Sequence, residues 1–371
     1  MKYYILAGEA SGDLHGSNLM KALMIEDPEA EIRFWGGDLM QEVGGTLVTH
    51  YKERAFMGFF EVIQNLRKIT SLIKACKKDI AQFQPDALIF IDNSGFNLRI
   101  AKWAKPLGFK THYYISPQVW ASRAGRVPTI KATIDHMYVI LPFVKDFYAK
   151  YKYDVHFVGH PLLDAIAGRK QVAAATFAEQ HNLDERPLIA LLPGSRKQEI
   201  TAMLDVMLSL VDDYPKYQFV IAGAPSQEEA FYAPFLKQHK VRLIMNQTYD
   251  ILSFANAALV TSGTATLETA LFKVPQVVCY KGNAISYAIA KRIIKLKYIS
   301  LVNLIMDKEV VTELIQGDFN TKTLKAALNQ ILDDYQRASL FLDYYDLEKT
   351  LGGKGASAKT AKLIVGYTKT Q

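Results

Sequence analysis

Two acidic side chains in the first half of the sequence occupy places where a general base is expected. Glu9 follows the opening apolar run of the chain, and Asp92 follows a later one. A carboxylate just beyond the end of a strand can accept a proton from an attacking hydroxyl group. A structural interpretation carries equal weight, because Ser11, Asp13 or Asp92 could instead cap the helix that follows. The residues predict a candidate general base without choosing between the two acids.

Two glycine-containing turns in the second half are typical of phosphate binding. Each follows an apolar run and precedes a helical pattern, so its backbone N–H groups would face an anion from the positive end of a helix. An arginine in a first helical turn opposes the helix dipole unless an anion is present. A glutamate one turn into the second helix can accept both hydroxyl groups of a ribose. Helix capping alone explains these residues less fully than a site that binds a nucleotide diphosphate. The residues of this predicted site are Gly194, Ser195, Arg196, Ser262, Gly263, Thr264 and Glu268.

Two further segments give weaker signals. Trp120 and Arg123 follow a predicted strand, and an aromatic side chain beside a cation suits a sugar or an acyl phosphate. An exposed tryptophan that lines the space between two domains without binding a ligand is an equally good interpretation. Asn303 is a single amide in an apolar stretch, and its spacing alone favours a turn or a hydrogen-bonded core amide.

The elements that must position these residues are short apolar runs that alternate with amphipathic stretches of helical spacing. Strands buried on both faces form continuous apolar runs, and their alternation with helices predicts parallel sheets of βαβ units. In such sheets ligands bind beyond the carboxyl ends of the strands, where the loops described above lie. We expect strands at 3–7, 32–35, 87–91, 110–115, 136–140, 156–158, 188–192, 218–222, 242–245, 257–261 and 275–280.

Two such sets of runs predict an α/β protein with two doubly wound, Rossmann-like domains that face each other across a cleft holding the site. The weakest pattern lies at 164–186, so we expect an acceptor domain at 1–170 and a nucleotide domain at 171–345. Residues 346–371 contain a glycine-rich break and a final helical pattern. We expect this tail helix to return to the first domain.

Composition excludes several classes of protein. The chain has 371 residues, with 44 Lys and Arg against 37 Asp and Glu and a formal net charge of +7. The basic residues are spread and are not interleaved with an aromatic platform, so we expect no nucleic-acid partner. Two cysteines exclude a disulfide framework. We expect neither a signal sequence nor a transmembrane helix, because no apolar run approaches about 20 residues.

Eight segments in register resemble the lipid-A-disaccharide synthases, family 19 glycosyltransferases of the two-domain GT-B type. Single motifs of this kind are weak, but eight in the same order are specific. The segments are AGEASGD at 7–13, MGFFEV at 57–62, PDALIFIDNSGFN at 85–97, YISPQVWASRAGRV at 114–127, GHPLLD at 159–164, LLPGSRKQEI at 191–200, SGTATLE at 262–268 and YISLVNLI at 298–305.

The resemblance implies an inverting hexosyltransferase of lipid A (lipopolysaccharide) biosynthesis. It would join UDP-2,3-diacylglucosamine to 2,3-diacylglucosamine 1-phosphate (lipid X), giving the β-1′,6-linked disaccharide 1-phosphate and UDP. The family often has a second acid where this chain has Gly95, which favours Asp92 as the essential carboxylate, with Glu9 as its rival. The family's important residues correspond to Glu9, Asp92, Arg196 and Asn303, and we expect substrate contacts from Ser11, Asn97, Trp120, Arg123, Met57 and Phe60.

The same resemblance sets expectations for cofactors and partners. The UDP-sugar is a substrate, so we expect no cofactor, and the cationic turns would replace a metal ion. Because both substrates carry acyl chains, we expect a peripheral protein on the cytoplasmic face of the inner membrane. Apolar residues at 56–63 form a candidate lipid-contacting patch, with the later turns up to residue 73 in the core, and the basic stretch 291–297 could share the membrane role. A homo-oligomer is left open.

Two alternatives share the phosphate-binding turns. A UDP-sugar 2-epimerase, or a transferase acting on a lipid-linked peptidoglycan precursor, would keep these turns but lacks the first-domain motifs AGEASGD and SPQVWA. A non-catalytic nucleotide-sugar binding protein would have no need for Asp92 and Glu9 together.

Overall fold

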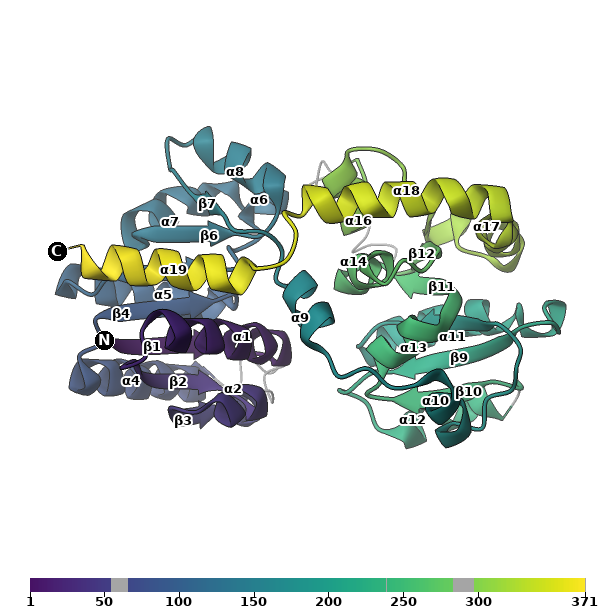
Figure 1. Cartoon of the computed structure of the whole chain (residues 1–371), viewed down its shortest axis with the longest axis horizontal. Helices are drawn as coiled ribbons and strands as arrows, with labels where there is room; N and C mark the ends of the chain where they lie inside the picture. The colour runs from purple at the N-terminus through teal and green to yellow at the C-terminus, as the bar shows by residue number, and fades with distance from the viewer. Residues whose placement is uncertain (55–65, 238, 283–296, 371) are drawn as a thin grey trace. The chain divides into compact units, whose positions relative to one another are not determined.

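The computed structural model describes residues 1–54, 66–237, 239–282 and 297–370. The chain divides into two compact units, residues 1–168 together with 351–371, and residues 169–350 (Figure 1). Each unit is an α/β domain built on a parallel sheet, as the alternation of apolar runs predicted. The change of unit after Gly168 lies close to the expected boundary, whereas the tail rejoins the first unit at Leu351 rather than at residue 346.

The first unit is a parallel sheet with the strand order β3-β2-β1-β4-β5-β6-β7. Its strands are β1 (Lys2–Ala7), β2 (Glu31–Gly36), β3 (Thr46–His50), β4 (Ala87–Ile91), β5 (Thr111–Tyr114), β6 (His136–Val139) and β7 (His156–Phe157). Its helices are α1 (Ala10–Glu26), α2 (Asp38–Val43), α4 (Leu66–Phe83), α5 (Ser94–Ala104), α6 (Val119–Ser122), α7 (Val127–Thr133), α8 (Pro142–Ala149), α9 (Leu162–Gly168) and α19 (Ala356–Lys369).

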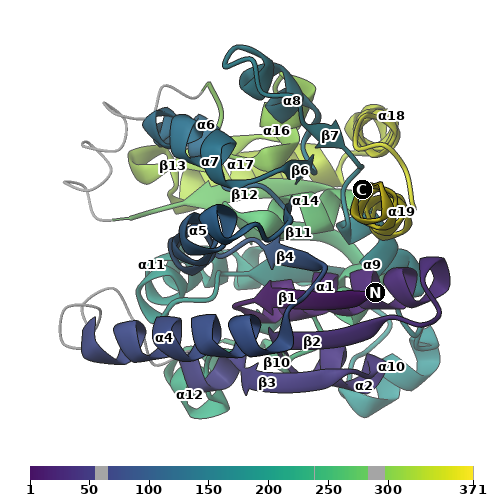
Figure 2. The ribbon, with the colours of Figure 1, turned by 90° about the vertical axis from the view of Figure 1, so that its left-hand side faces the viewer.

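Helices cover both faces of this sheet, as two neighbouring tyrosines of β1 show. Tyr3 donates its hydroxyl group to Asp27 at the end of α1, whereas Tyr4 donates to Asp79 on α4. Successive strand residues point to opposite faces, so α1 and α4 lie on opposite sides of the sheet (Figure 2). Both tyrosines are fully buried. The continuous apolar run at 3–7 is therefore explained by burial on two faces.

The chain ends in a helix that belongs to the first unit. α19 packs along α1, and Asp164 of α9 accepts hydrogen bonds from the backbone N–H groups of Gly355 (2.6 Å) and Ser357 (2.9 Å). The tail helix thus returns to the first domain, as the glycine break suggested.

The second unit has the parallel strand order β10-β9-β8-β11-β12-β13. Its strands are β8 (Leu188–Leu192), β9 (Gln218–Gly223), β10 (Arg242–Met245), β11 (Ala255–Thr261), β12 (Gln276–Tyr280) and β13 (Glu313–Ile315). Its helices are α10 (Ala174–Gln180), α11 (Lys197–Leu208), α12 (Glu229–Leu236), α13 (Thr248–Phe254), α14 (Thr264–Leu271), α16 (Leu301–Met306), α17 (Thr321–Leu332) and α18 (Asp334–Thr350). One apolar cluster joins the sheet to α11, α12 and α17, and another joins it to α10 and α13.

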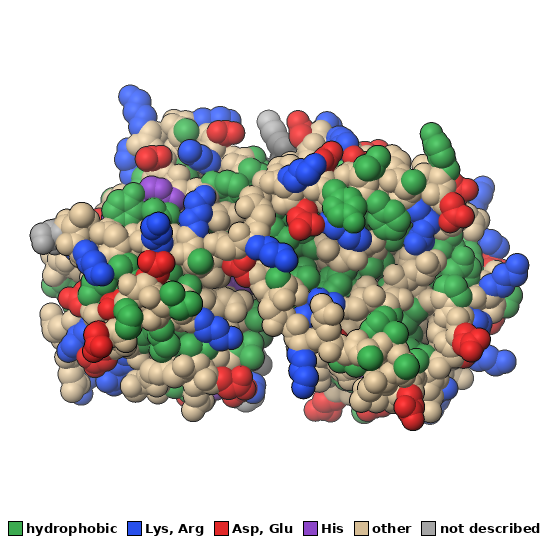
Figure 3. Space-filling model, in the orientation of Figure 1, with side chains coloured by type: hydrophobic (Ala, Val, Ile, Leu, Met, Phe, Trp, Pro, Cys, Tyr) green, Lys and Arg blue, Asp and Glu red, His purple; other side chains and the backbone are tan. Residues whose placement is uncertain are grey.

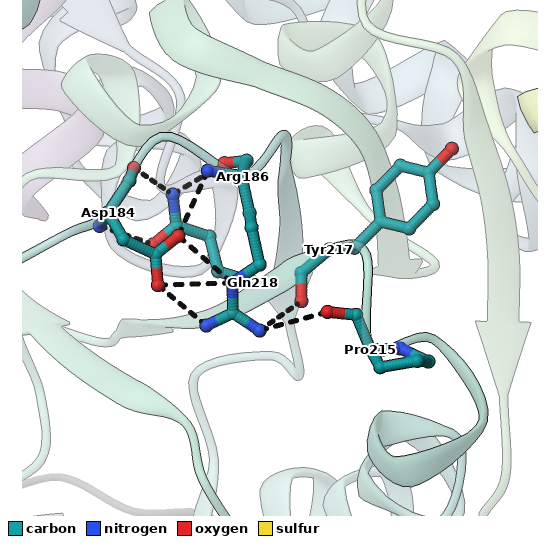
Figure 4. A network of polar contacts seen from close by, with 5 residues as sticks. All are labelled: Asp184, Arg186, Pro215, Tyr217 and Gln218. Atoms are coloured by element: carbon teal, nitrogen blue, oxygen red, sulfur yellow. Dashed lines mark hydrogen bonds and ion pairs between the residues drawn. The ribbon is translucent and has the colours of Figure 1, made fainter.

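A polar network ties together the beginnings of β8 and β9. Arg186 pairs with Asp184 and also donates to the carbonyl oxygens of Pro215 and Tyr217, while Gln218 donates to the carbonyl oxygens of Asp184 and Arg186 (Figure 4). These groups satisfy one another at the amino ends of the strands. The polar loops singled out from the sequence lie at the opposite ends.

Candidate functional site

Each of the two sheets has its own point at which the strand order reverses, and candidate loops lie at each of these points. In the first unit β1 and β4 are neighbours although the chain visits β2 and β3 between them, and in the second unit the same holds for β8 and β11. Connections on the two sides of such a switch point run to opposite faces, which leaves a crevice beyond the carboxyl ends of the strands. Glu9 and Asp92 flank the first switch point, and the turns at 193–196 and 262–264 flank the second.

The two acids of the first unit interact electrostatically. Glu9 is exposed at the start of α1, and Asp92 is half-buried just beyond β4. Burial raises the pKa of the Asp92 carboxyl above its ordinary value, and the negative charge of Glu9 raises it further. A carboxylate with a raised pKa binds a proton more readily, which suits a general base. Burial and the neighbouring charge of Glu9 thus both make the Asp92 carboxyl easier to protonate.

The backbone of Asp92 is held in an unusual conformation by its neighbours. Asp92 and Asn93 both have φ of +43°, a left-handed conformation that costs non-glycine residues energy. The Asn97 amide donates to the carbonyl oxygens of Leu6 (3.3 Å), Ile91 (3.2 Å) and Asp92 (2.8 Å), and the Tyr113 hydroxyl also donates to Asp92. Asn97 is only 1% exposed, so the structure gives it a positioning role instead of the expected substrate contact.

The remaining polar residues of the first loop separate into exposed and structural ones. Ser11 is exposed in the first turn of α1, where a ligand can reach it. Asp13 is buried and accepts hydrogen bonds from the backbone N–H groups of Gly37, Leu39 and Met40. The capping alternative therefore holds for Asp13, but the helix that it caps is α2 and not α1.

The short helix α6 after β5 carries Trp120 and is followed by Arg123, at the same end of the sheet. Trp120 is half-exposed, meets Phe143 edge-on with ring centroids 4.8 Å apart, and donates its indole N–H to Gln118. Arg123 is exposed. Both are placed where a ligand of the first unit could reach them.

In the second unit, Gly194, Ser195 and Arg196 connect β8 to α11. Gly194 has φ of +105°, and a Cβ atom there would lie 3.1 Å from the Glu199 carboxylate, so this turn requires glycine. The Arg196 side chain is 82% exposed and pairs with Glu199 at 3.1 Å. An exposed pair of this kind is weak, so the guanidinium can exchange Glu199 for an anionic ligand.

The second turn joins β11 to α14. Gly263 and Thr264 are exposed, and Ser262 donates its hydroxyl group to the carbonyl oxygen of Ile299 at 3.0 Å. Glu268 lies one turn into α14 and accepts a hydrogen bond from the Tyr249 hydroxyl at 2.8 Å. Burial raises the pKa of the Glu268 carboxyl, and the bond from Tyr249 opposes that rise. Tyr249 gave no signal in the sequence, because it comes from α13 and meets Glu268 only in the fold.

Asn303 is the hydrogen-bonded core amide that its spacing favoured, and not a residue placed to touch a substrate. It is fully buried, and its amide makes hydrogen bonds only within the chain, to Glu313 and to the backbone of Val310 and Val311. A direct contact with a substrate is closed to it in this structure.

Several expectations about lipid and metal cannot be placed on this geometry. Met57, Phe60, the rest of 56–63 and most of the basic stretch 291–297 lie outside the described residues. On α4, Ile69 and Ile73 are half-buried, and the interior positions are Cys76, Ile80 and Phe83. Within the described residues, no group of three or more His, Cys, Asp or Glu side chains is gathered to hold a metal ion, and no helix is long and apolar enough to cross a membrane. On the face drawn in Figure 3, basic and acidic side chains are interspersed.

Comparison with known proteins identifies the family of this chain. The family model described as lipid-A-disaccharide synthetase matches residues 3–364. The chain belongs to this family.

Relatives named lipid-A-disaccharide synthase match over nearly the whole chain. The one from Syntrophus aciditrophicus is 39% identical, with 98% of this chain and 97% of the relative covered. Those from Geobacter metallireducens and Coxiella burnetii (strain CbuG_Q212) are 37% and 35% identical, each with 97% of this chain and 96% of the relative covered. This lipid-A-disaccharide synthase family member is therefore a glycosyltransferase of lipid A biosynthesis.

Solved structures give the fold class. A putative UDP-N-acetylglucosamine 2-epimerase from Listeria monocytogenes has a TM-score of 0.68 at 12% identity, with 100% of this chain and 96% of that chain covered. The calicheamicin glycosyltransferase CalG4 has a TM-score of 0.58 at 14% identity, with both chains covered completely. The expected GT-B fold is confirmed.

Proposed function

We propose that this glycosyltransferase moves 2,3-diacylglucosamine from UDP to the 6-hydroxyl group of 2,3-diacylglucosamine 1-phosphate, with inversion at C1 of the donor sugar. The products are the β-1′,6-linked disaccharide 1-phosphate and UDP. Family membership supports the substrate class. The observation that carries the mechanism is the half-buried Asp92 carboxyl, electrostatically coupled to Glu9 at the β1/β4 switch point.

Asp92 acts as the general base in this proposal. As the bond between the acceptor oxygen and C1 forms, the hydroxyl proton passes to the Asp92 carboxylate, and the bond between C1 and the diphosphate oxygen breaks with its electron pair on UDP. A base whose pKa is raised toward the working pH transfers protons more efficiently. Burial and the charge of Glu9 supply that rise.

The second unit holds the leaving group. The exposed Arg196 guanidinium and the backbone N–H groups of Gly194, Ser195, Gly263 and Thr264 would take up the charge that develops on the diphosphate. Loss of one such donor costs about 10²–10³ in rate. Glu268, which Tyr249 holds in place, would accept the ribose hydroxyl groups.

The decisive experiment measures UDP release from UDP-2,3-diacylglucosamine with and without lipid X, with mass spectrometry of the lipid product. Asp92→Asn is expected to lower turnover by about 10²–10⁴, the contribution of a general base, while UDP still binds. The matched control is Asp86→Asn, because Asp86 lies at the amino end of the same strand and is exposed. Wild-type turnover in Asp92→Asn would refute the assignment of the base.

The same assay distinguishes the alternative functions. UDP release without a disaccharide would indicate hydrolysis, and a change of configuration at C2 of a UDP-sugar would indicate an epimerase. Tight UDP binding without any turnover would favour a binding protein. Undiminished transfer in EDTA would support our expectation that the reaction needs no metal ion.

We further propose that the enzyme works at the cytoplasmic face of the inner membrane as a peripheral protein. The acyl chains of both proposed substrates support this, since their hydrocarbon is stable only in a bilayer or a protein pocket. Sedimentation with anionic vesicles at increasing salt tests it, and failure to bind at every salt concentration would refute it.

A further inference from the structure

A short segment of the second unit lies directly against the turn that we propose binds the diphosphate. Ser262 donates its hydroxyl group to the carbonyl oxygen of Ile299 at 3.0 Å, and Ser262 is the first residue of that turn. Ser300 is fully buried, and its hydroxyl group caps α16 by accepting from the backbone N–H of Asn303 at 3.2 Å. The position of residues 299–303 therefore affects the turn.

Glu313 on β13 fixes this segment through three hydrogen bonds. Its Oε2 accepts from the backbone N–H of Ile299, and its Oε1 accepts from the backbone N–H of Ser300, both at 2.9 Å. Oε1 also accepts from the Asn303 amide at 2.9 Å. A carboxylate that accepts from two successive backbone N–H groups and a side-chain amide holds all three in one orientation, with charge-assisted bonds.

Asn303 links the same segment to Glu313 and to the residues just before β13. Its amide group donates to the carbonyl oxygen of Val311 at 2.8 Å as well as to Glu313. The side-chain oxygen of Asn303, Oδ1, accepts from the backbone N–H groups of Val310 (2.8 Å) and Val311 (3.0 Å). Two donor and two acceptor positions are thus all used inside the protein, which leaves none for a ligand.

We propose that Glu313 and Asn303 are positioning residues that hold residues 299–303 against Ser262 and so set the shape of the diphosphate-binding turn. The inference rests on the proposed function of that turn and extends it to a residue that no sequence motif indicated. It also gives Asn303, which the family resemblance marked as important, a role that its burial permits.

Glu313→Gln is the informative substitution, because glutamine has the same shape but a different hydrogen-bonding capacity. Glutamine carries an NH2 group in place of one carboxylate oxygen. That group donates hydrogen bonds, so it cannot accept one from the N–H group that the oxygen held. At least one of the three bonds is lost, and the segment loses its fixed orientation. Glu348→Gln serves as the matched control, since Glu348 is a half-buried glutamate of the same unit whose carboxylate pairs with Lys273 at 2.6 Å.

The experiment uses the full-length chain and titrates UDP by calorimetry. We expect UDP binding to weaken about tenfold in Glu313→Gln, equivalent to about 1.4 kcal/mol, and to stay at the wild-type value in Glu348→Gln. Ser262→Ala removes the link between the segment and the turn. The double variant Glu313→Gln with Ser262→Ala should therefore bind UDP no more weakly than the weaker single variant.

Two outcomes would overturn the inference. One is an unchanged UDP affinity in Glu313→Gln, whatever its melting temperature. The other is a double variant whose losses multiply, which indicates two independent effects. If the wild-type chain does not bind UDP, the proposed function fails, and amide hydrogen exchange decides the positioning role separately. Faster exchange at Ile299 and Ser300 in Glu313→Gln supports that role, and unchanged exchange refutes it.

Discussion

At the Asp92 carboxyl, burial and the charge of Glu9 act in the same direction, because both disfavour the ionised form and raise its pKa. A general base must be ionised to accept a proton, so kcat/KM should rise with pH through the pKa of Asp92. In Glu9→Gln the neighbouring negative charge is absent, and the pKa of Asp92 should fall. We therefore expect the acidic limb of the kcat/KM profile to move to lower pH in Glu9→Gln.

The pH profile of Glu29→Gln provides the comparison for this prediction. Glu29 is exposed and precedes β2 at the amino edge of the same sheet, far from the carboxyl ends of the strands. Its removal should leave the acidic limb in place. If the limb does not move in Glu9→Gln either, Glu9 has no influence on the base.

At the residue scale, the sequence predicted the chemical types of the site better than their roles. Acids and small hydroxyl residues after apolar runs are visible without a structure. An amide is ambiguous, because it can bind a ligand or satisfy the backbone, and Asn97 and Asn303 both do the latter. Tyr113 and Glu313 could not be predicted, since Tyr113 meets Asp92 only when β4 and β5 pair, and Glu313 meets residues 299–303 only when the chain folds back before β13.

At the scale of elements, the β1–α1 loop and the β4–α5 loop fit together at Gly8. A Cβ atom on Gly8 would lie 1.9 Å from Nδ2 and 3.0 Å from Cβ of Asn93, so the Asn93 side chain would have to move. Gly8→Ala should push Asn93 away and with it the adjacent Asp92, so we expect kcat to fall by at least about tenfold. A misplacement of about 1 Å in a reacting group can cost 10²-fold.

Gly95→Ala is the matched variant, because a Cβ atom there has no neighbour within 4 Å. It changes the same residue type in the first turn of α5, next to the β4–α5 loop, but it should keep wild-type turnover. Steady-state kinetics of both variants, with circular dichroism to verify folding, checks the pair. Equal turnover in the two would mean that the contact at Gly8 does not position the base.

The same scale explains which elements the sequence could predict. Central strands such as β4 and β8 are buried on both faces and form continuous apolar runs, and their bounds agree with the expected ones. The edge strands β3 and β13 were missed, because they are mostly half-buried and carry polar residues, and β13 has only three residues. Strand β13 carries Glu313, so this omission also concealed the partner of Asn303.

At the scale of the whole molecule, the chain leaves the first unit after Gly168 and rejoins it at Leu351. The glycine break before the last helix suggested this return, but no pattern indicated what would hold the helix. Asp164, in the segment GHPLLD, accepts from the backbone N–H groups of Gly355 and Ser357. These groups begin α19, where N–H groups have no partner within the helix. The segment GHPLLD thus has a structural role in closing the first unit.

Asp164→Ala should consequently destabilise the first unit and leave UDP binding by the second unit unchanged. Loss of a helix cap costs about 0.5–2 kcal/mol. Tryptophan fluorescence during urea unfolding isolates the effect, because all three tryptophans of the chain, Trp35, Trp103 and Trp120, belong to the first unit. The fluorescence midpoint should move to lower urea in Asp164→Ala but not in Asp146→Ala, whose side chain is exposed on α8 of the same unit. An unchanged midpoint in Asp164→Ala would show that packing of α19 along α1 suffices without the cap.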